Sequence, residues 1–411
     1  MKIRIGPVPT IVGCLVIQLC VGIIYLWSVF RGDVAFSFEW ADSAVKMVSS
    51  YMLLSFVFGN LVGGYVNDKK GPRFTAVLGI LMFAVGVGTT GLLNKSNIGL
   101  MYFTYCLLGG LGSGIAYGAC ISGVQKWLPH RRGLASGLAV CAFGLSTVVF
   151  SPVSKWLISH FKDSATGIVD FAPVFFILAG VFCVLGLIAC IFVRLPDKRY
   201  LDSLPKIEGG KIVSAKRDYT LGEAVKTVPF WCIFFFIFFI NGTWNLSVPL
   251  IQGLGMERGL SESAALLTVS LTGIANAAGR LSMATLSDKI GREAADISLS
   301  ALTVVGAIFM TFIGGYAYTV VILLIAFGYG GPAAINPAIS TDFFGAKYSG
   351  TNYGILMLAL GFSSVFFNMI SNTVLKGAVM PTFIMGAATA VISIVFMLVI
   401  RKYSKKIKSA Q

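Results

Sequence analysis

Twelve apolar runs of membrane-span length follow one another along this chain of 411 residues. Because a helix needs roughly 20 apolar residues to cross the hydrocarbon core of a bilayer, each run is long enough for one crossing. The runs cover residues 8–30, 44–66, 74–93, 98–124, 133–158, 171–194, 228–252, 263–286, 294–315, 317–339, 349–375 and 381–400. They predict an all-α membrane protein with twelve transmembrane helices.

The composition agrees with an exterior that faces lipid and argues against other classes of protein. Charged residues make up 12% of the chain, whereas about a quarter of a typical soluble domain is charged. The net charge of +15 does not call for nucleic acid, because Lys and Arg gather at the ends of the apolar runs. All eight cysteines lie inside apolar runs, and we interpret them as packing residues. With no recognisable nucleophile, metal cluster or nucleotide loop, we expect neither an enzyme nor a cofactor.

The distribution of basic residues predicts the orientation. With the N-terminus inside the cell, the outer loops hold little more than Arg31, Lys95, Lys162, Arg258 and Lys376, and most other basic residues are internal. The positive-inside rule therefore predicts a multi-pass protein of the cell (inner) membrane with both termini in the cytoplasm. We expect it to be a monomer.

The long polar stretch in the middle of the chain divides the twelve runs into six and six. Thr220 and Glu223 form a capping box that predicts a short helix near its end. The expected parts are an N-terminal six-helix bundle at 1–194, a cytoplasmic linker with a short helix at 195–227, a C-terminal six-helix bundle at 228–400 and a basic cytoplasmic tail at 401–411.

Two internal matches indicate that the halves are repeats. Gly59-Asn60-Leu61 and Asp68-Lys69-Lys70-Gly71 recur 220 residues later as Gly279-Arg280-Leu281 and Asp288-Lys289-Ile290-Gly291. A second set recurs 217 residues later, with Gly133, Gly137, Ala142, Gly144 and Ser146 matching Gly350, Gly354, Ala359, Gly361 and Ser363. The matched runs cross the membrane in the same direction, so the repeat is parallel, and its halves can rock about a central site.

The loop at 64–73 has the pattern Gly-x-x-x-Asp-[Lys/Arg]-x-Gly-x-[Lys/Arg]. A carboxylate at the end of a helix can pair with cations and with a neighbouring helix N-terminus, and so hold an inner gate shut. The gating candidates are Asp68, Lys69 and Arg73, with Asp288 and Arg292 in the second copy. The alternative is a tight turn with topogenic charges. The loop resembles the signature loop of the major facilitator superfamily, whose duplicated twelve-helix plan covers the whole chain.

Arg280 is the most informative single residue, because a guanidinium deep in a span costs about 2.5–3.5 kcal/mol on insertion scales. Thr272, Asn276 and Arg280 recur every four residues and so form one polar stripe that should line a cavity. The guanidinium offers a fork of donors that suits a carboxylate. All 17 acidic residues fall in loops or at the ends of runs, so an anion is favoured as substrate. The alternative is an arginine that snorkels to the cytosol.

A closer resemblance involves the fourth and fifth runs. Trp127-Leu128-Pro129-His130-Arg131-Arg132-Gly133-Leu134-Ala135-Ser136-Gly137, preceded by Gly114-Ile115-Ala116-Tyr117-Gly118, is similar to the signature of oxalate:formate antiporters and monocarboxylate transporters. The resemblance implies a small carboxylate as substrate, gripped by Arg280. It also implies that Tyr25, Tyr117 and Tyr329 form walls of the pocket.

Two departures from that resemblance narrow the expectation. Oxalate exchangers have a lysine in the eleventh helix where this chain has Leu360, so one carboxylate can be neutralised rather than two. Leu360, with Phe143, Leu145 and Met357, suits the alkyl end of lactate or pyruvate, and core packing is the alternative. Animal monocarboxylate carriers have an aspartate where this chain has Asn276, so the proton is expected to travel on the substrate or on Glu257 or Glu262.

The function expected from the sequence is therefore secondary active transport of small monocarboxylates such as lactate or pyruvate. Proton symport by rocker-switch alternating access is the leading scheme, because an anion that enters an inside-negative cell alone opposes about 2.3 kcal/mol per 100 mV. Carboxylate exchange of the oxalate:formate type is the alternative. The expected partners are the anion, protons and the lipid bilayer.

Overall fold

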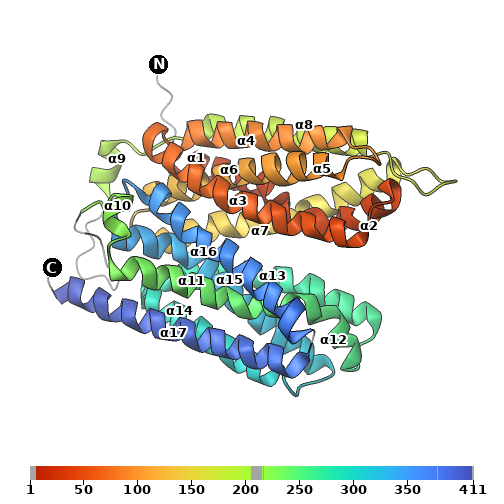
Figure 1. Cartoon of the computed structure of the whole chain (residues 1–411). Coiled ribbons are helices and arrows are strands. Elements are labelled where there is room, and N and C mark those ends of the chain that lie inside the picture. The colour runs from red at the N-terminus through yellow and green to blue at the C-terminus, as the bar shows by residue number, and fades with distance from the viewer. Residues whose placement is uncertain (1–5, 205–214, 216, 377, 410–411) are drawn as a thin grey trace. The chain divides into compact units, whose positions relative to one another are not determined.

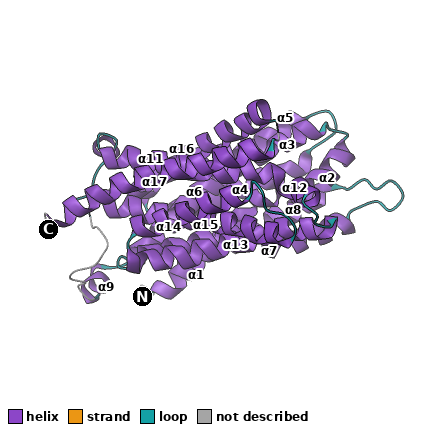
Figure 2. Cartoon of the chain, turned by 90° about the horizontal axis from the view of Figure 1, so that it is seen from below, coloured by secondary structure: helices purple, strands orange, loops and turns teal. Residues whose placement is uncertain are grey.

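The computed structural model describes residues 6–204, 215, 217–376 and 378–409. Parts of the predicted linker and tail, at 205–214, 216 and 410–411, lie outside the described residues. Helices are the regular elements of the described chain, apart from one isolated β-bridge between Lys162 and Val169 (Figure 2). The all-α prediction is confirmed.

All twelve predicted runs are helical, although several of them are divided. The first six runs correspond to α1 (Pro7–Val21), η1 (Gly22–Leu26) and α2 (Trp27–Phe38); α3 (Asp42–Lys70); α4 (Pro72–Thr89) with η2 (Thr90–Leu92); α5 (Ile98–Met101), η3 (Tyr102–Gly109) and α6 (Gly110–Trp127); α7 (Arg132–His160); and α8 (Phe171–Phe192). The last six correspond to α11 (Val228–Ser247), η4 (Val248–Leu250) and α12 (Ile251–Glu257); α13 (Glu262–Ile290); α14 (Arg292–Phe309); α15 (Tyr316–Phe344); α16 (Ser349–Ile370) with η5 (Ser371–Leu375); and α17 (Val379–Ser409).

Ten helices of the described residues are long and apolar enough to cross a membrane. The two other predicted runs are helical but differ in character. The first is broken by the tighter turn η1, which leaves the shorter apolar helix α1. The ninth, α14, has Arg292, Glu293 and Asp296 in its first two turns.

The chain forms two compact units, each described here separately. The first comprises Met1–Trp127 and Ala142–Leu204, and the second comprises Leu128–Cys141 and Pro205–Gln411. Helix α7 is shared between them, and its first residues belong to the second unit.

In the first unit, α6 packs against α1, α3 and α4, and α8 packs against α1 and α4 (Figure 1). Glycines make the approach to α6 close. A Cβ on Gly114 would lie 2.0 Å from the carbonyl oxygen of Phe56 in α3, and one on Gly112 would lie 2.3 Å from the backbone nitrogen of Phe83 in α4. Only glycine permits backbones to meet at these distances, so the run of glycines sets the position of α6.

In the second unit, α13 packs along α15, and α17 packs against α11 and α14 (Figure 1). Glycines again bring two backbones together. A Cβ on Gly279 of α13 would lie 2.3 Å from the carbonyl oxygen of Phe327, and one on Gly330 of α15 would lie 2.2 Å from that of Asn276. The α13–α15 pair therefore holds the polar stripe of α13 in a fixed position against α15.

The polar stretch between the units contains two short helices, α9 (Lys198–Ser203) and α10 (Leu221–Ala224). The predicted capping box is confirmed, because the Glu223 carboxylate accepts a bond of 2.9 Å from the backbone nitrogen of Thr220 and one of 2.8 Å from its hydroxyl. Hydrogen bonds from the Thr220 backbone and hydroxyl, together with nearby Arg217, hold the pKa of Glu223 below its usual value.

Candidate functional site

Arg280 lies on α13, ten residues before the helix ends at Ile290, which corresponds to about 15 Å of helix. Only 4% of its surface is exposed. Its Nη1 donates a hydrogen bond of 2.9 Å to the carbonyl oxygen of Val140 in the first part of α7. A buried guanidinium is expensive, and this contact holds it in place within the second unit.

The other members of the α13 stripe lie one and two turns from Arg280. Asn276 is half-buried, and its Oδ1 has no hydrogen-bond partner among the described residues. Thr272 is buried, and its hydroxyl donates to the carbonyl oxygen of Val269 at 2.6 Å. Tyr329, on the adjacent helix α15, stacks on Trp244 of α11 with ring centroids 5.2 Å apart. This part of the second unit therefore combines a cation, an amide and two aromatic rings.

The aromatic candidates of the first unit form a separate cluster. The ring of Tyr117 on α6 lies 4.9 Å from that of Phe143 on α7 and 5.1 Å from that of Phe56 on α3. Phe56 and Phe143 are 5.5 Å apart, so the three rings contact one another. Tyr117 and Phe143 were predicted from the sequence, whereas Phe56 was not.

The remaining candidates are more dispersed. Met357 is buried and Leu360 half-buried on α16, which packs on α11 and α15. Leu145, on the part of α7 in the first unit, is exposed. Tyr25 lies in η1, and its side chain is outside the described residues.

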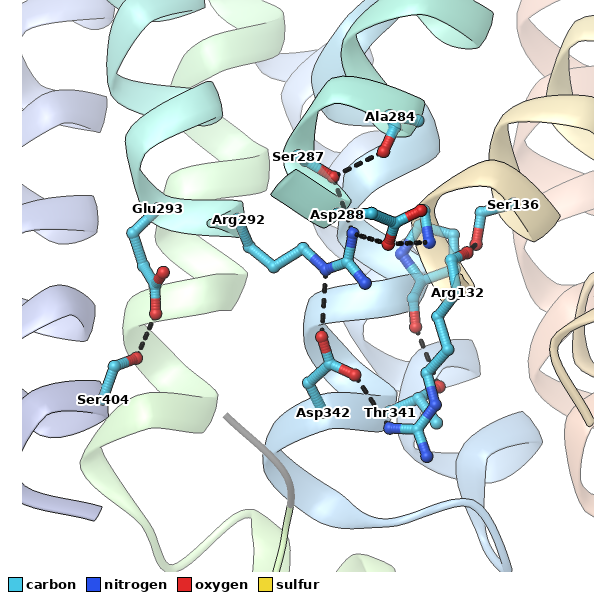
Figure 3. Close-up of polar contacts among 12 residues, drawn as sticks. Arg132, Ser136, Ala284, Ser287, Asp288, Arg292, Glu293, Thr341, Asp342 and Ser404 are labelled. Carbon is cyan, nitrogen blue, oxygen red and sulfur yellow. Dashed lines mark hydrogen bonds and ion pairs between the residues drawn. The ribbon is translucent and has the colours of Figure 1, made fainter. Parts of the chain in front are cut away.

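The second copy of the signature loop forms a buried group of ion pairs, which we call the ion-pair cluster: Arg132, Asp288, Arg292 and Asp342 (Figure 3). Arg292 bonds the carboxylate of Asp288 at 2.6 Å and, through Nε, that of Asp342 at 2.9 Å. Arg132 bonds the other oxygen of Asp342 at 2.8 Å. Asp288 and Arg292 were predicted from the sequence as gating residues. Arg132 was noted only as part of the signature at 127–137, and Asp342, 210 residues further on, was not predicted.

Asp288 also accepts two hydrogen bonds from the first turn of α7. The backbone nitrogens of Gly133 and Leu134 lie 2.9 and 2.8 Å from its carboxylate oxygens. These amides are among the donors that a helix N-terminus leaves without intrahelical partners, so an anion is favoured there. A Cβ on Gly133 would lie 2.1 Å from the carbonyl oxygen of Ala284, so only glycine fits at this contact.

The first copy of the loop, in the first unit, is arranged differently. Asn67 donates to the hydroxyl of Ser122 at 3.2 Å and to Asp68 at 3.5 Å. Lys69 is exposed, bonds the hydroxyl of Tyr65 and lies 4.2 Å above that ring. Arg73 is exposed on the first turn of α4. The bond of Lys69 to Tyr65 thus stays within α3, whereas the bond of Asn67 to Ser122 reaches α6.

The helical architecture and the signature loop agree with the protein family that the sequence matches. The family model described as the Major Facilitator Superfamily matches residues 12–368. The chain belongs to the major facilitator superfamily. It is therefore a multi-pass membrane protein and a secondary transporter rather than an enzyme, as the signature loop and the repeat indicated.

The chain is also similar to two curated relatives, and it shares its fold with a solved structure. It is 28% identical to the oxalate:formate antiporter of Oxalobacter formigenes, over 85% of this chain and 81% of that protein. It is 24% identical to the apicoplast pyruvate carrier 1 of Toxoplasma gondii, over 86% and 75%. The proton:xylose symporter XylE has the same fold, with a TM-score of 0.71 at 16% identity over 95% of each chain. The resemblance to carboxylate transporters is confirmed.

Two acidic residues at the ends of predicted runs are more deeply buried than the sequence indicated. Asp342 belongs to the ion-pair cluster, and Asp296 on α14 is fully buried. Each lies within one or two turns of a basic loop, where a carboxylate ordinarily reaches solvent. Asp296 could have been noticed in the sequence because it follows Arg292 by four residues. This spacing places both side chains on one face of a helix.

Proposed function

We propose that this chain transports small monocarboxylates such as lactate or pyruvate, coupled to protons, by alternating access. The observation that carries the proposal is Arg280, a buried cation on α13 with an amide one turn away. A guanidinium is suited to bind a carboxylate through paired hydrogen bonds. The similarity to an antiporter of oxalate and formate and to a pyruvate carrier supports the same chemical class.

The preference for one carboxylate over two follows from the apolar residues of α16. Leu360 is half-buried and Met357 is buried, and neither can neutralise a second carboxylate. Leaving an ionised group against such side chains costs several kcal/mol. The further residues proposed to contact the substrate are Phe143, Tyr117, Leu145 and Tyr25 of the first unit and Tyr329 of the second. Their apolar and aromatic character suits a short alkyl or keto group.

The ion-pair cluster is proposed to act as the gate of the cycle. To break the ion-pair cluster, Arg292 and Asp288 must leave their buried partners. We therefore expect the cluster to be either intact or open, without stable intermediate arrangements. Asp68, Lys69 and Arg73 are proposed to take the corresponding role in the first loop.

The proposed topology follows the positive-inside rule. Both termini, the linker at 195–227 and the tail at 401–411 lie in the cytoplasm, and the bundles at 1–194 and 228–400 span the inner membrane. The transporter acts as a monomer.

Carboxylate exchange is the second candidate, and the similarity to an oxalate:formate antiporter favours it. Exchange of equal charges needs no accompanying proton, whereas net anion uptake does. Glu257 and Glu262 are exposed and remain candidates for carrying that proton in the symport scheme.

Uptake into proteoliposomes tests both candidates. With an inward proton gradient and no internal anion, a symporter accumulates labelled lactate above equilibrium, and an uncoupler abolishes the excess. An exchanger takes up label only when carboxylate is present inside, whatever the proton gradient. Unlabelled pyruvate should compete strongly and oxalate weakly. Absence of carboxylate uptake under every gradient would refute the proposal.

A further inference from the structure

Asp296 is a fully buried carboxyl group that the transport scheme described above does not use. It lies on α14, its exposed fraction is 0%, and neither of its oxygens has a hydrogen-bond partner among the described residues. An ionised carboxylate in such surroundings is strongly disfavoured, whereas a protonated one is a small neutral group. In this arrangement of the second unit, Asp296 therefore carries its proton.

The charged groups whose fields reach Asp296 are Glu293 and Arg292, both on its own helix. Arg292 is engaged by Asp288 from α13 and Asp342 from α15, as Figure 3 shows. Glu293 accepts a hydrogen bond from the hydroxyl of Ser404 on α17. Arg292, the cation on the same helix as Asp296, is therefore already paired with two other carboxylates.

The cations of α17 whose side chains the structure describes lie near its end and are exposed: Arg401, Lys402, Lys405 and Lys406. Lys289 at the end of α13 is likewise exposed. On the buried face of α17, Ser393 bonds Ser300 of α14 at 3.0 Å. The segment Val228–Ser247 of α11 contains no charged residue, and Cys232 is its only ionisable side chain.

The local charge balance also favours a proton on Asp296. The group contains four carboxyl groups and two guanidinium groups, namely Asp288, Glu293, Asp296 and Asp342 with Arg132 and Arg292. With all six ionised, this buried region would hold two uncompensated negative charges. A proton on Asp296 removes one of them at the position that has no donor.

Arg292 is the residue that connects Asp296 to the proposed gate. Its Nη2 is buried and has no hydrogen-bond partner among the described residues. Asp296 follows Arg292 by four residues on α14, so the two side chains lie on the same face of the helix, one turn apart. A guanidinium released by Asp288 and Asp342 could therefore pair with Asp296 by a change of side-chain conformation.

We infer that Asp296 is the proton-binding site of this transporter and that it exchanges Arg292 with the ion-pair cluster. When Asp296 is protonated, Arg292 stays with Asp288 and Asp342 and the cluster is intact. When Asp296 loses its proton, it competes for Arg292 and weakens the cluster. By linkage, lower pH stabilises the intact cluster, and opening of the cluster promotes proton release.

The inference rests on the proposed carboxylate transport, because the proton on Asp296 would couple that transport to the proton gradient. It assigns the proton to a residue of the second unit and not to the exposed Glu257 or Glu262. It also explains how protonation of Asp296 controls the opening of the ion-pair cluster although the proton does not contact the substrate.

The test compares Asp296→Asn, which imitates the neutral acid, with Asp202→Asn, which neutralises an exposed acid on α9. One co-transported proton supports about tenfold accumulation of lactate for an inward gradient of one pH unit. Wild type and Asp202→Asn should reach this value. Asp296→Asn should lose the accumulation while retaining counterflow of labelled lactate against internal lactate. Proton-driven accumulation by Asp296→Asn equal to that of wild type would overturn the inference.

A second measurement does not depend on transport. Infrared difference spectra of the purified chain, recorded across a pH titration, should contain a carboxylic C=O band that Asp296→Asn removes and Asp296→Glu shifts. Arg292→Ala should extend that band to higher pH, because the ionised form would lose its countercharge. Absence of any band assignable to Asp296 would refute the site. If wild type shows the band but neither uptake nor counterflow, the proposed substrate fails while the proton site stands.

Discussion

The two copies of the signature loop share Asp, Lys and Gly at matching positions, namely Asp68 and Asp288, Lys69 and Lys289, and Gly71 and Gly291, but their surroundings differ. In the second copy, Asp288 is bonded to Arg292 and to the first turn of α7, and the group is largely buried. In the first copy, Lys69 and Arg73 are exposed, and the carboxylate of Asp68 accepts a hydrogen bond of 3.5 Å from its neighbour Asn67. The two copies therefore differ in how deeply their basic side chains are buried.

The two loops differ in charge directly after the shared glycine. With the offset of 220 residues, Arg292 corresponds to Pro72, and Glu293 corresponds to Arg73. Pro72 starts α4 with a fixed φ angle and has no charge to pair. Arg292 starts α14 at the same place and directs its guanidinium to two carboxylates. Asp296 corresponds to Ala76, so the first half has no carboxyl group at the matching position.

The largest effect should come from removing the cation of the second loop. Arg292→Ala leaves Asp288 and Asp342 buried without their shared partner, and such a loss typically costs about 3–5 kcal/mol. Pro72→Ala, the matched change in the first loop, should cost at most about 1 kcal/mol. Denaturant unfolding in detergent measures both. Equal losses of unfolding free energy in the two variants would show that the two loops stabilise the protein equally, which would contradict this expectation.

An intermediate effect should follow from separating α7 from the second loop. Gly133→Ala places a methyl group 2.1 Å from the carbonyl oxygen of Ala284, which should cost about 1–3 kcal/mol and weaken the bonds to Asp288. Gly180→Ala on α8 is the control, because a Cβ there meets no atom within 4 Å. Thermal unfolding of the two variants tests this. A Gly133 variant as stable as the control would contradict the close contact.

The smallest effect should come from the exposed lysines of the loops. Lys69→Ala removes a bond to Tyr65, and Lys289→Ala removes an exposed charge, so each should change the unfolding free energy by no more than about 0.5–1 kcal/mol. The same unfolding assay applies. A loss of several kcal/mol at Lys69 would indicate that the first loop is tied more strongly than its local contacts imply.

The features predicted from the sequence were those with local periodicity. The apolar runs specify the helices, and the spacing of Thr272, Asn276 and Arg280 specifies one face of α13. The capping box at Thr220 is likewise a local pattern, and it forms as predicted. The pairing of a loop carboxylate with a helix N-terminus was predicted in kind, and the structure has it at Asp288, while its gating role stays a prediction.

Features that depend on distant partners were not accessible in this way. Arg132 and Asp342 form an ion pair although 210 residues separate them, and no sequence motif contains both residues. The burial of Asp296 depends on helices α13, α15 and α17 closing around the start of α14, which no local pattern encodes. The contact of Phe56 with Tyr117 and Phe143 is similarly a product of packing.

The most direct test of the account concerns Arg280 as the countercharge for a carboxylate. Lactate uptake should be compared among wild type, Arg280→Ala, Arg280→Lys and Gly273→Ala, a control on the same helix whose Cβ would meet no atom within 4 Å. Loss of hydrogen bonds to a charged partner should lower uptake by about 10–100-fold in Arg280→Ala. Lysine should restore little, since it lacks the planar fork of donors. Uptake by a properly inserted Arg280→Ala variant at the level of the Gly273→Ala control would contradict the account.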